Sequence, residues 1–329
     1  DQLRADALTR YAPLFADGGF RRLAARAAGA TGHYGQQNTY TGPGHALITT
    51  GAYGYLNGVT QNKFWNVRSG RSEAMMFDPG ANVLGDKDGG PEEETSPKNL
   101  VGSNLADELR LRDAGSRAVG VALKGRGSLL LAGHLGTAYF FSDQTGRMTT
   151  TTYYRSALPD WAERWNARKP ADGYFGQTWE RLLPAERYSG VDDSPYEMDV
   201  KGLGRTFPHK LTGKQSAPGP AFYEVLTHAP QGIDLTLDFA RAALDGEQLG
   251  KRGSTDFLGV SISSTDLAGH AFGHESHEYQ DVLARLDRAM GSFVADLEKR
   301  FKPGEFVFAF TADHGAAPHH RHAEEGLVD

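Results

Sequence analysis

The stretch TDFLGVSISSTDLAGH (255–270) decides the fold, because an apolar run of strand length leads directly into a motif with a carboxylate and a histidine. Such runs are typical of strands buried on both faces of a parallel sheet. Three more apolar runs predict strands, at 118–124, 128–134 and 305–312. Helical patterns alternate with them, at 104–113, 232–244 and 278–301. We therefore expect an α/β fold with a central, mostly parallel sheet flanked by helices.

Shorter elements surround this predicted sheet. Residues 4–28 predict two short helices separated at Asp17-Gly18-Gly19, and residues 136–154 predict a hairpin that turns at 143–146. Residues 155–230 are aromatic and rich in proline, without a clear period. We expect this last segment to form a cap or a long insertion.

The composition excludes several classes of protein. The chain has 329 residues and a formal net charge of -6, without a dense basic run. A basic surface for nucleic acid is therefore not expected. No apolar stretch approaches the roughly 18 residues of a membrane span. Because the chain has no cysteine, a metal would have to be held by His, Asp, Glu or hydroxyl groups.

Two Asp-His pairs follow predicted strands near the end of the chain. Asp266 and His270 follow the strand within 255–264, and Asp313 and His314 follow the strand at 305–312. Ligands collect at the carboxyl ends of strands in open α/β sheets. Asp and His together are ligands for zinc or a similar divalent ion. The alternative is that each Asp caps a helix and each His is an ordinary surface or core residue.

A hydroxyl side chain stands in a third polar motif. The sequence TGPG (41–44) predicts a turn into a helix over HALITTGA (45–52), with Thr41 near the helix start. Helix N-termini favour anions, because their free N–H groups and the helix dipole point toward the ligand. A threonine there can attack phosphorus if a metal lowers the pKa of its hydroxyl. The alternative role for Thr41 is a simple N-cap.

Taken together, these motifs resemble the alkaline phosphatase superfamily, most closely bacterial enzymes of the PafA and PhoK type. The shared segments run in the family's order over nearly the whole chain: DQLR (1–4), TGPGHALITTG (41–51), GVTQN (58–62), LKGRGSLLLAGH (123–134), TTTYYRSALPDWAERWN (150–166), TDLAGHAFG (265–273) and TADHG (311–315). The resemblance implies an alkaline-phosphatase-like fold with a central, mostly parallel sheet. It also implies that the chain divides into three sections. Residues 1–154 would form the first part of the catalytic core, 155–230 the cap, and 231–329 the second part, with the metal ligands.

The resemblance also implies two zinc ions. Asp1, Asp313, His314 and the Thr41 hydroxyl would bind one ion. Asp266 and His270 would bind the second, which the family completes with a histidine far downstream of TADHG.

The family's further histidine does not occur in this sequence, which stops at Asp329. The strand that precedes Asp1 in the family is also outside it. We therefore expect this sequence to be the body of a longer phosphatase, and we interpret His319, His320 and His322 as loop residues. The resemblance implies a periplasmic or secreted protein.

Two basic residues bear on the substrate. Lys124 and Arg126, in LKGRG, match family residues that contact the transferred phosphoryl group, and Asn62 matches a neutral donor. Arginine binds phosphate through two parallel hydrogen bonds, and lysine adds a point charge. Because a monoester dianion carries one more charge than a diester, the pair indicates small-molecule phosphate monoesters. Locally, the same residues could be solvated groups in a tight turn.

Three functions are compatible with this sequence. The first is a zinc-dependent phosphomonoester hydrolase that forms a phosphothreonine at Thr41. The second is a phosphodiesterase, nucleotide pyrophosphatase or phosphonate esterase on the same scaffold. The third is an inactive phosphoester-binding module, which is favoured if the second metal is not held. The sequence does not predict an oligomeric state.

Overall fold

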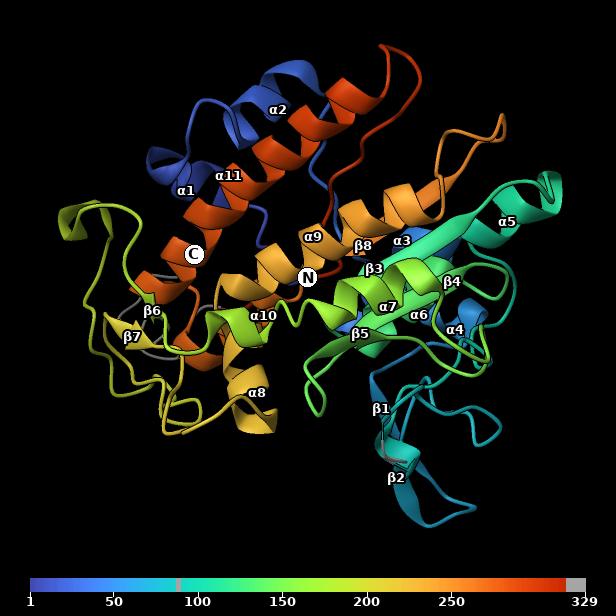
Figure 1. Ribbon diagram of the computed structural model, residues 1–329, viewed down its shortest axis with the longest axis horizontal. Helices are drawn as coiled ribbons and strands as arrows, with labels where there is room; N and C mark the ends of the chain where they lie inside the picture. The colour runs from blue at the N-terminus through green and yellow to red at the C-terminus, as the bar shows by residue number, and fades with distance from the viewer. Residues whose placement is uncertain (87–89, 318–329) are drawn as a thin grey trace. The chain divides into compact units, whose positions relative to one another are not determined.

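A computed structural model describes residues 1–86 and 90–317, and the chain separates into two compact units. Unit 1 comprises Asp1–His33, Tyr174–Asp234 and Ser263–Asp329. Unit 2 comprises Tyr34–Gly173 and Leu235–Ile262. Each unit is therefore assembled from segments that lie far apart in the sequence (Figure 1).

Unit 2 contains the main sheet of the described residues, with strand order β5-β4-β3-β8. Strand β3 (Ala118–Ala122) pairs in parallel with both β4 (Thr137–Ser142) and β8 (Phe257–Ser261). Strand β5 (Arg147–Thr149) closes the predicted hairpin by pairing antiparallel with β4. The predicted α/β class with a mostly parallel sheet is confirmed.

Helices cover both faces of this sheet. Neighbouring residues of a strand point to opposite faces, so the contacts of two successive residues of β4 show which helices pack on each face. Ala138 of β4 joins a buried cluster with Ala46 of α3 (Thr41–Thr50) and Leu129 of α6 (Gly125–Ala132). The next residue, Tyr139, packs on Trp161 of α7 (Asp160–Ala167) and Phe239 of α9 (Gln231–Gly246). Helices α3 and α6 therefore cover one face, and α7 and α9 the other.

The strand predicted at 128–134 is wrong, because this segment belongs to α6. Leu129 and Leu130 are buried on this helix, which packs on β3 and β4. The contact is close: a Cβ added at Gly120 of β3 would lie 2.2 Å from the Ser128 carbonyl oxygen. A short apolar run does not distinguish a buried helix from a buried strand, and leucine and alanine favour the helix.

The remaining elements of unit 2 are short. They are α4 (Gly54–Asn57), β1 (Lys63–Asn66), β2 (Arg71–Ala74), the 3-10 helix η2 (Gly90–Glu92) and α5 (Leu105–Arg112). Helix α5 confirms the prediction at 104–113. Asn104 accepts a hydrogen bond from the Asp107 N–H, and the Asp107 side chain bonds back to the Asn104 N–H. This capping box explains where the helix begins.

Unit 1 is built around α11 (His277–Arg300), which confirms the long helix predicted at 278–301. The helices α1 (Ala7–Arg10) and α2 (Phe20–Arg26) confirm the two predicted near the start of the chain, and α2 packs on α11. Buried Asp287 of α11 accepts hydrogen bonds from the Ala16 and Phe20 N–H groups. The other elements are η1 (Ala12–Leu14), η3 (Asp172–Tyr174, at the unit boundary), β6 (Thr178–Trp179), η4 (Ala185–Arg187), β7 (His209–Lys210), α8 (Pro220–His228) and α10 (Ser264–Phe272).

The buried strand predicted at 305–312 is wrong. The segment forms no strand within the described residues, and the Val307 side chain is 96% exposed. A strand requires a partner for its backbone N–H and C=O groups, and the described residues pair none with this segment. Its apolar composition alone predicted the strand.

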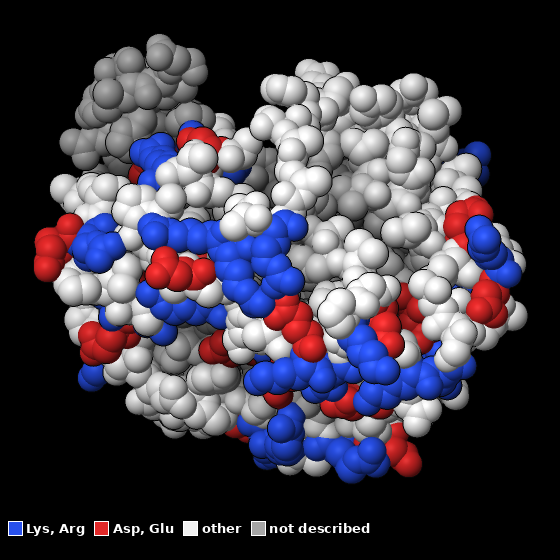
Figure 2. Space-filling view, turned by 90° about the horizontal axis from the view of Figure 1, so that it is seen from above, with Lys and Arg blue, Asp and Glu red and all other residues white. Residues whose placement is uncertain are grey.

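The division into a core and a cap at 155–230 stays a prediction. This range contains α7, α8 and the small sheet of β6 and β7, and the two units share it. Basic and acidic side chains are interspersed on the face drawn in Figure 2. Among the described residues, no helix has both the length and the apolar character that a bilayer crossing requires.

Candidate functional site

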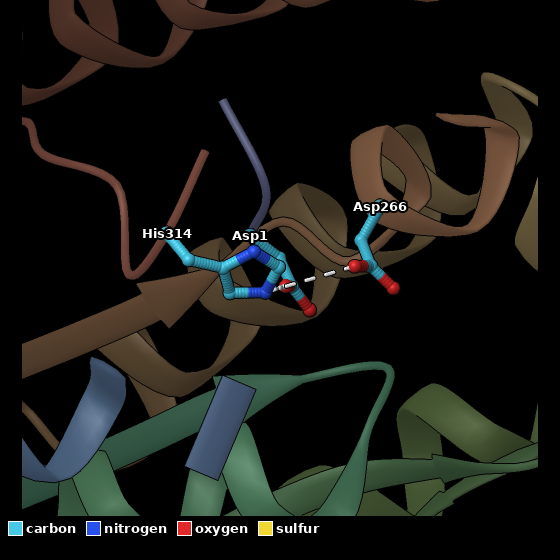
Figure 3. Close-up of side chains that lie close together, drawn as sticks. All are labelled: Asp1, Asp266 and His314. Atoms are coloured by element: carbon cyan, nitrogen blue, oxygen red, sulfur yellow. Dashed lines mark ion pairs between the residues drawn. The ribbon is translucent and has the colours of Figure 1, made fainter. Parts of the chain in front are cut away.

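Three predicted metal ligands converge in unit 1. Ligand atoms of Asp1, Asp266 and His314 all lie within 4.8 Å of one another (Figure 3). The His314 Nε2 is 3.5 Å from an Asp1 carboxylate oxygen and 3.8 Å from one of Asp266. It is also 3.6 Å from Asp313 Oδ2. Three carboxylates thus surround one buried imidazole nitrogen.

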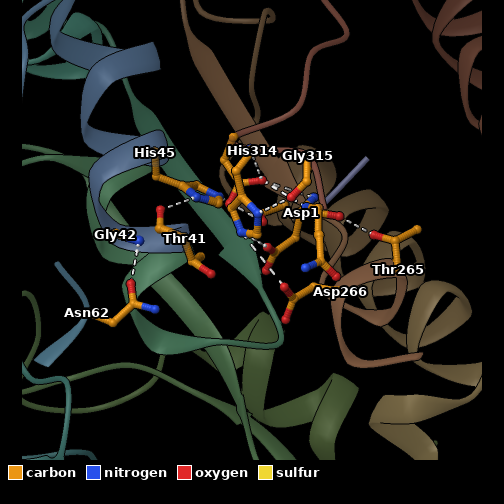
Figure 4. A network of polar contacts seen from close by, with 12 residues as sticks. Asp1, Thr41, Gly42, His45, Asn62, Thr265, Asp266, His314 and Gly315 are labelled. Atoms are coloured by element: carbon orange, nitrogen blue, oxygen red, sulfur yellow. Dashed lines mark hydrogen bonds and ion pairs between the residues drawn. The ribbon is translucent and has the colours of Figure 1, made fainter. Parts of the chain in front are cut away.

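Backbone contacts place these residues, although they come from opposite ends of the sequence. The Leu3 N–H donates to the His314 carbonyl over 3.0 Å, and the Gln2 N–H donates to Asp313 Oδ1 over 2.9 Å. The Thr265 hydroxyl, on α10 beside Asp266, donates to the Asp1 carbonyl. The segment 1–3 is therefore joined both to 313–314 and to α10 (Figure 4).

The hydrogen bonding of His314 decides what its Nε2 can bind. The Nδ1 lies 2.8 Å from the Gly315 carbonyl oxygen, which can only accept, so Nδ1 carries the proton. In the neutral ring, Nε2 then presents a lone pair toward the three carboxylates. The Nε2 is buried and has no hydrogen-bond partner among the described residues. A cation between these groups would remove their mutual repulsion, so the donor set fits a divalent metal.

His270 lies at the margin of this cluster. Its Nε2 is 3.3 Å from Asp266 Oδ1, and its side chain is 63% exposed. The pair occupies positions i and i+4 on α10, which lie on one face of a helix. Asp266 therefore lies near His270, its predicted partner at the second zinc, and also near His314, a predicted ligand of the first zinc. Predicted loop residues His319, His320 and His322 are outside the described residues.

In unit 2, Thr41 is the first residue of α3 and is buried, so TGPG forms the first helical turn instead of the predicted turn before the helix. Pro43 is tolerated there, because first-turn N–H groups have no partner within the helix. The Gly42 N–H donates to Asn62 Oδ1 over 2.7 Å (Figure 4). A Cβ added at Gly42 would lie 3.0 Å from that oxygen. Asn62 is thereby fixed beside the predicted nucleophile, with its amide NH₂ left as donor.

Lys124 and Arg126 stand at the start of α6, at the carboxyl end of β3. Lys124 is the N-cap residue, and Arg126 lies in the first turn. Glu94 binds Arg126 twice, through the Arg126 backbone N–H at 2.6 Å and through its guanidinium group. The first turns of α6 and α3 are close, because a Cβ added at Gly127 would lie 3.4 Å from His45 Nε2. Two helix N-termini, a lysine and an arginine therefore favour an anion in this part of unit 2.

The sequence interpretation missed three side chains that support these groups, those of His45, Glu94 and His274. His45 bridges the Thr41 carbonyl and the Ser261 hydroxyl, at 2.9 Å from each. Glu94 holds Arg126, and His274 bonds to Gln2, next to Asp1. Burial lowers the pKa of His274 to about 4, so its ring is neutral near pH 7. The only signal for these roles would have been that a carboxylate or histidine near a motif is buried. A single sequence does not show whether one given position is buried.

Comparison with known proteins assigns this arrangement to a class. The family described as type I phosphodiesterase / nucleotide pyrophosphatase matches residues 1–327. The chain belongs to this family.

Several characterised proteins are similar over 96% of the chain. A protein named calcium-transporting ATPase from Myroides odoratus and alkaline phosphatase PhoV from Synechococcus elongatus are each 38% identical to it. The chain covers 58% of the length of each. Alkaline phosphatase PafA of Elizabethkingia meningoseptica is 34% identical.

The crystal structure of wild-type PafA matches the whole chain with a TM-score of 0.91 and 34% identity. The chain covers 64% of that structure. A PafA variant with a threonine, an asparagine, a lysine and an arginine replaced matches with a TM-score of 0.90. The four replaced positions have the same spacing along PafA as Thr41, Asn62, Lys124 and Arg126 have here.

Proposed function

We propose that this chain carries the catalytic residues of an alkaline phosphatase, a zinc-dependent hydrolase of small phosphate monoesters that works through a phosphothreonine at Thr41. The observation that carries the proposal is the His314 Nε2 lone pair, buried and facing the carboxylates of Asp1, Asp266 and Asp313. Bringing three carboxylates together in a buried place costs free energy, because they repel one another and lose water. A cation bound between them would offset this cost.

The proposal assigns two zinc ions to unit 1. Asp1, Asp313 and His314 would hold one, and Asp266 and His270 would supply ligands to the other. When bound, zinc lowers the pKa of a coordinated hydroxyl or water and neutralises charge on phosphoryl oxygens. Because the Nδ1 of His314 donates to the Gly315 carbonyl oxygen, Nε2 is the ring nitrogen that can act as the ligand.

Unit 2 supplies the groups that act on the phosphoryl group. The Thr41 Oγ attacks phosphorus, the bond to the leaving oxygen breaks, and the alcohol departs with a proton. Water then attacks the phosphothreonine, which releases inorganic phosphate and restores the Thr41 hydroxyl. Each step moves one phosphoryl group and needs no oxidant or reductant. The Asn62 amide, Lys124 and Arg126 would bind the nonbridging oxygens, which carry the charge of a loose transition state.

Preference for monoesters follows from charge. A monoester dianion gains more from Lys124 and Arg126 than a diester monoanion does, because the two differ by one charge at contact distance. Two converging helix starts act in the same direction. The spacing shared with the four replaced residues of PafA supports these assignments.

A second candidate, hydrolysis of phosphodiesters or phosphonate esters, is favoured by the name of the family, type I phosphodiesterase / nucleotide pyrophosphatase. It would use the same nucleophile and metal ligands. The two candidates differ in what Lys124 and Arg126 contribute. An inactive phosphoester-binding module is the third candidate, and it predicts no turnover of either substrate.

The test compares kcat/KM for an aryl phosphate monoester and its matched diester, using the zinc-loaded protein. We expect the monoester to be preferred. We expect the double variant Lys124→Ala/Arg126→Ala to lose about 10²- to 10⁴-fold on the monoester, since each charged hydrogen bond contributes about 1.5–3 kcal/mol. The diester should lose less.

A matched control removes the same charges from exposed ion pairs of unit 2. Lys63 pairs with Glu92 and Arg147 with Glu163. Lys63→Ala/Arg147→Ala should leave both rates unchanged. Equal losses on both substrates in the Lys124→Ala/Arg126→Ala variant would favour the diesterase instead, and no turnover by the zinc-loaded wild type would favour the binding module.

A further inference from the structure

Gln2, the residue after the predicted ligand Asp1, has an unusual backbone conformation. Its φ is 46°, in the left-handed region that residues with a Cβ rarely adopt, and its side chain is buried. Such a conformation persists only where surrounding contacts impose it, and it occurs preferentially at functional sites. The contacts of Gln2 therefore need a physical account.

Three described residues hold Gln2 in place. Its N–H donates to Asp313 Oδ1 over 2.9 Å, and its carbonyl accepts from the Tyr279 hydroxyl over 3.4 Å. Its side-chain Oε1 lies 3.0 Å from His274 Nε2, and because an amide oxygen only accepts, the histidine donates. The main chain of Gln2 is thus tied to a metal-ligand carboxylate, and its side chain to a histidine.

His274 is itself fixed from several sides. Its carbonyl accepts a hydrogen bond of 2.6 Å from the Tyr11 hydroxyl, and its ring packs on Tyr279 with 4.7 Å between ring centroids. Gly269, on α10, leaves room for the His274–Gln2 hydrogen bond. A Cβ there would lie 2.5 Å from His274 Nε2 and 2.9 Å from Gln2 Oε1.

We propose that His274 is a positioning residue for the metal site, holding Asp1 and Asp313 in binding geometry through its hydrogen bond to Gln2. Without this bond, Gln2 is free to leave the left-handed region. The peptide that joins Asp1 to Gln2 then rotates, which moves the Asp1 carboxylate and withdraws the Gln2 N–H from Asp313 Oδ1. The inference rests on the proposed role of Asp1, Asp313 and His314 as zinc ligands.

The competing explanation is that His274 only fills space in unit 1. Stability alone does not separate the two, because a buried histidine that loses its hydrogen bond destabilises the fold in either case. Zinc affinity does separate them. Groups that orient metal ligands typically change metal affinity by 10- to 100-fold, whereas packing residues away from the site do not.

The experiment measures the affinity of the protein for Zn²⁺ by competition with a chromophoric chelator at fixed pH. We expect His274→Phe, which keeps a ring but loses the donor, to weaken zinc binding by about 10-fold or more. His274→Gln, whose amide can donate from the same position, should restore most of the affinity. Gly269→Ala should weaken binding as His274→Phe does, without altering His274 or Gln2 chemically.

Two control variants calibrate these effects. Gly18→Ala makes the same substitution in unit 1 where the added Cβ meets nothing within 4 Å. His277→Phe removes another buried histidine, which contacts Arg181 and the Gly190 carbonyl. Neither should change zinc affinity, although His277→Phe should lower the melting temperature of the metal-free protein.

The outcomes distinguish this inference from the proposed function. If the wild type binds zinc tightly and Asp313→Asn does not, the metal site stands. Unchanged affinity in both His274→Phe and Gly269→Ala would then overturn the positioning role alone. If the wild type itself binds zinc no better than Asp313→Asn, both proposals fall.

Discussion

The two units place their polar groups in different ways. In unit 2, the proposed catalytic side chains other than Asn62 stand at helix starts: Thr41 begins α3, Lys124 is the N-cap of α6, and Arg126 lies in its first turn. In unit 1, Asp266 and His270 lie on α10, but Asp1, Asp313 and His314 lie on irregular segments that the backbone N–H groups of Gln2 and Leu3 join. The difference fits the proposed function, because an anion can be bound by helix N-termini, whereas a metal needs side chains arranged around one point.

The units also differ in how completely their site groups are paired. In unit 2, Asn62 Oδ1 accepts from Gly42 and Arg126 is bound by Glu94. In unit 1, the buried His314 Nε2 faces carboxylates and has no hydrogen bond among the described residues. The proposed metal ligands of unit 1 therefore leave a buried nitrogen without a hydrogen bond in the described part of the chain, where a cation would fit, whereas Asn62 and Arg126 of unit 2 each bind a group of the protein. Three predictions test this comparison.

The largest effect is expected for Thr41→Ala. Loss of the proposed nucleophile should lower kcat by about 10³-fold or more, while bound zinc changes little, because the other proposed zinc ligands lie in unit 1. Thr41→Ser, which keeps a hydroxyl, should retain much of the activity. The measurements are kcat, zinc content, and the position of phosphate in protein quenched during turnover. Phosphate on any other residue would contradict the assignment of the nucleophile.

A smaller effect is expected for Glu94→Gln. The variant keeps the size of the side chain but weakens its hold on Arg126, so kcat/KM for a monoester should fall about 10-fold. Zinc affinity should not change. Glu92→Gln, at an exposed residue paired with Lys63, is the control. A rise in kcat/KM would mean that Glu94 competes with the substrate for Arg126 and does not orient it.

The smallest effect concerns the stability of unit 1. Burial and, to a lesser extent, the charge of Glu278 raise the pKa of Glu197 from its ordinary 4.5 to about 8. The folded state therefore favours protonated Glu197. Its contribution to stability is complete below pH 4.5 and is lost as the pH rises toward 8.

Glu197→Gln, which resembles the protonated acid, should therefore be more stable than the wild type at pH 9 and similar at pH 4.5. A difference of about 1–2 kcal/mol would appear as a melting temperature several degrees higher. Glu180→Gln, at an exposed position of unit 1, is the control. Equal melting temperatures for Glu197→Gln and the wild type at pH 9 would show that Glu197 is ionised in the fold without cost.

The sequence predicted the elements with a strong local signal. The helices at 104–113, 232–244 and 278–301 and the strand within 255–264 are confirmed. The prediction for 128–134 failed because a short apolar run fits a buried helix as well as a buried strand, and no local pattern reports the close packing of this helix on Gly120. The segment at 305–312 failed because apolar composition does not supply a strand with a partner.

For the candidate site, the motifs predicted which residues bind metal or act on the phosphoryl group. Those assignments stay predictions. The motifs did not predict what supports these residues. Gln2 and His274 stand 272 positions apart, and Glu94 and Arg126 stand 32 apart. Contacts at such separations arise from tertiary packing. A single sequence shows no pattern that would identify these residues as contact partners.

The segment 305–310, EFVFAF, has a practical consequence for work on this chain. It combines aromatic and β-branched residues with one charge and no proline, and Val307 and Phe310 are exposed. Short segments of this composition promote aggregation when they are exposed, because their backbones pair between molecules. We therefore expect purified preparations of these 329 residues to self-associate as the concentration rises. A lysine at position 307 is the least intrusive remedy, since the valine side chain there is almost entirely in solvent.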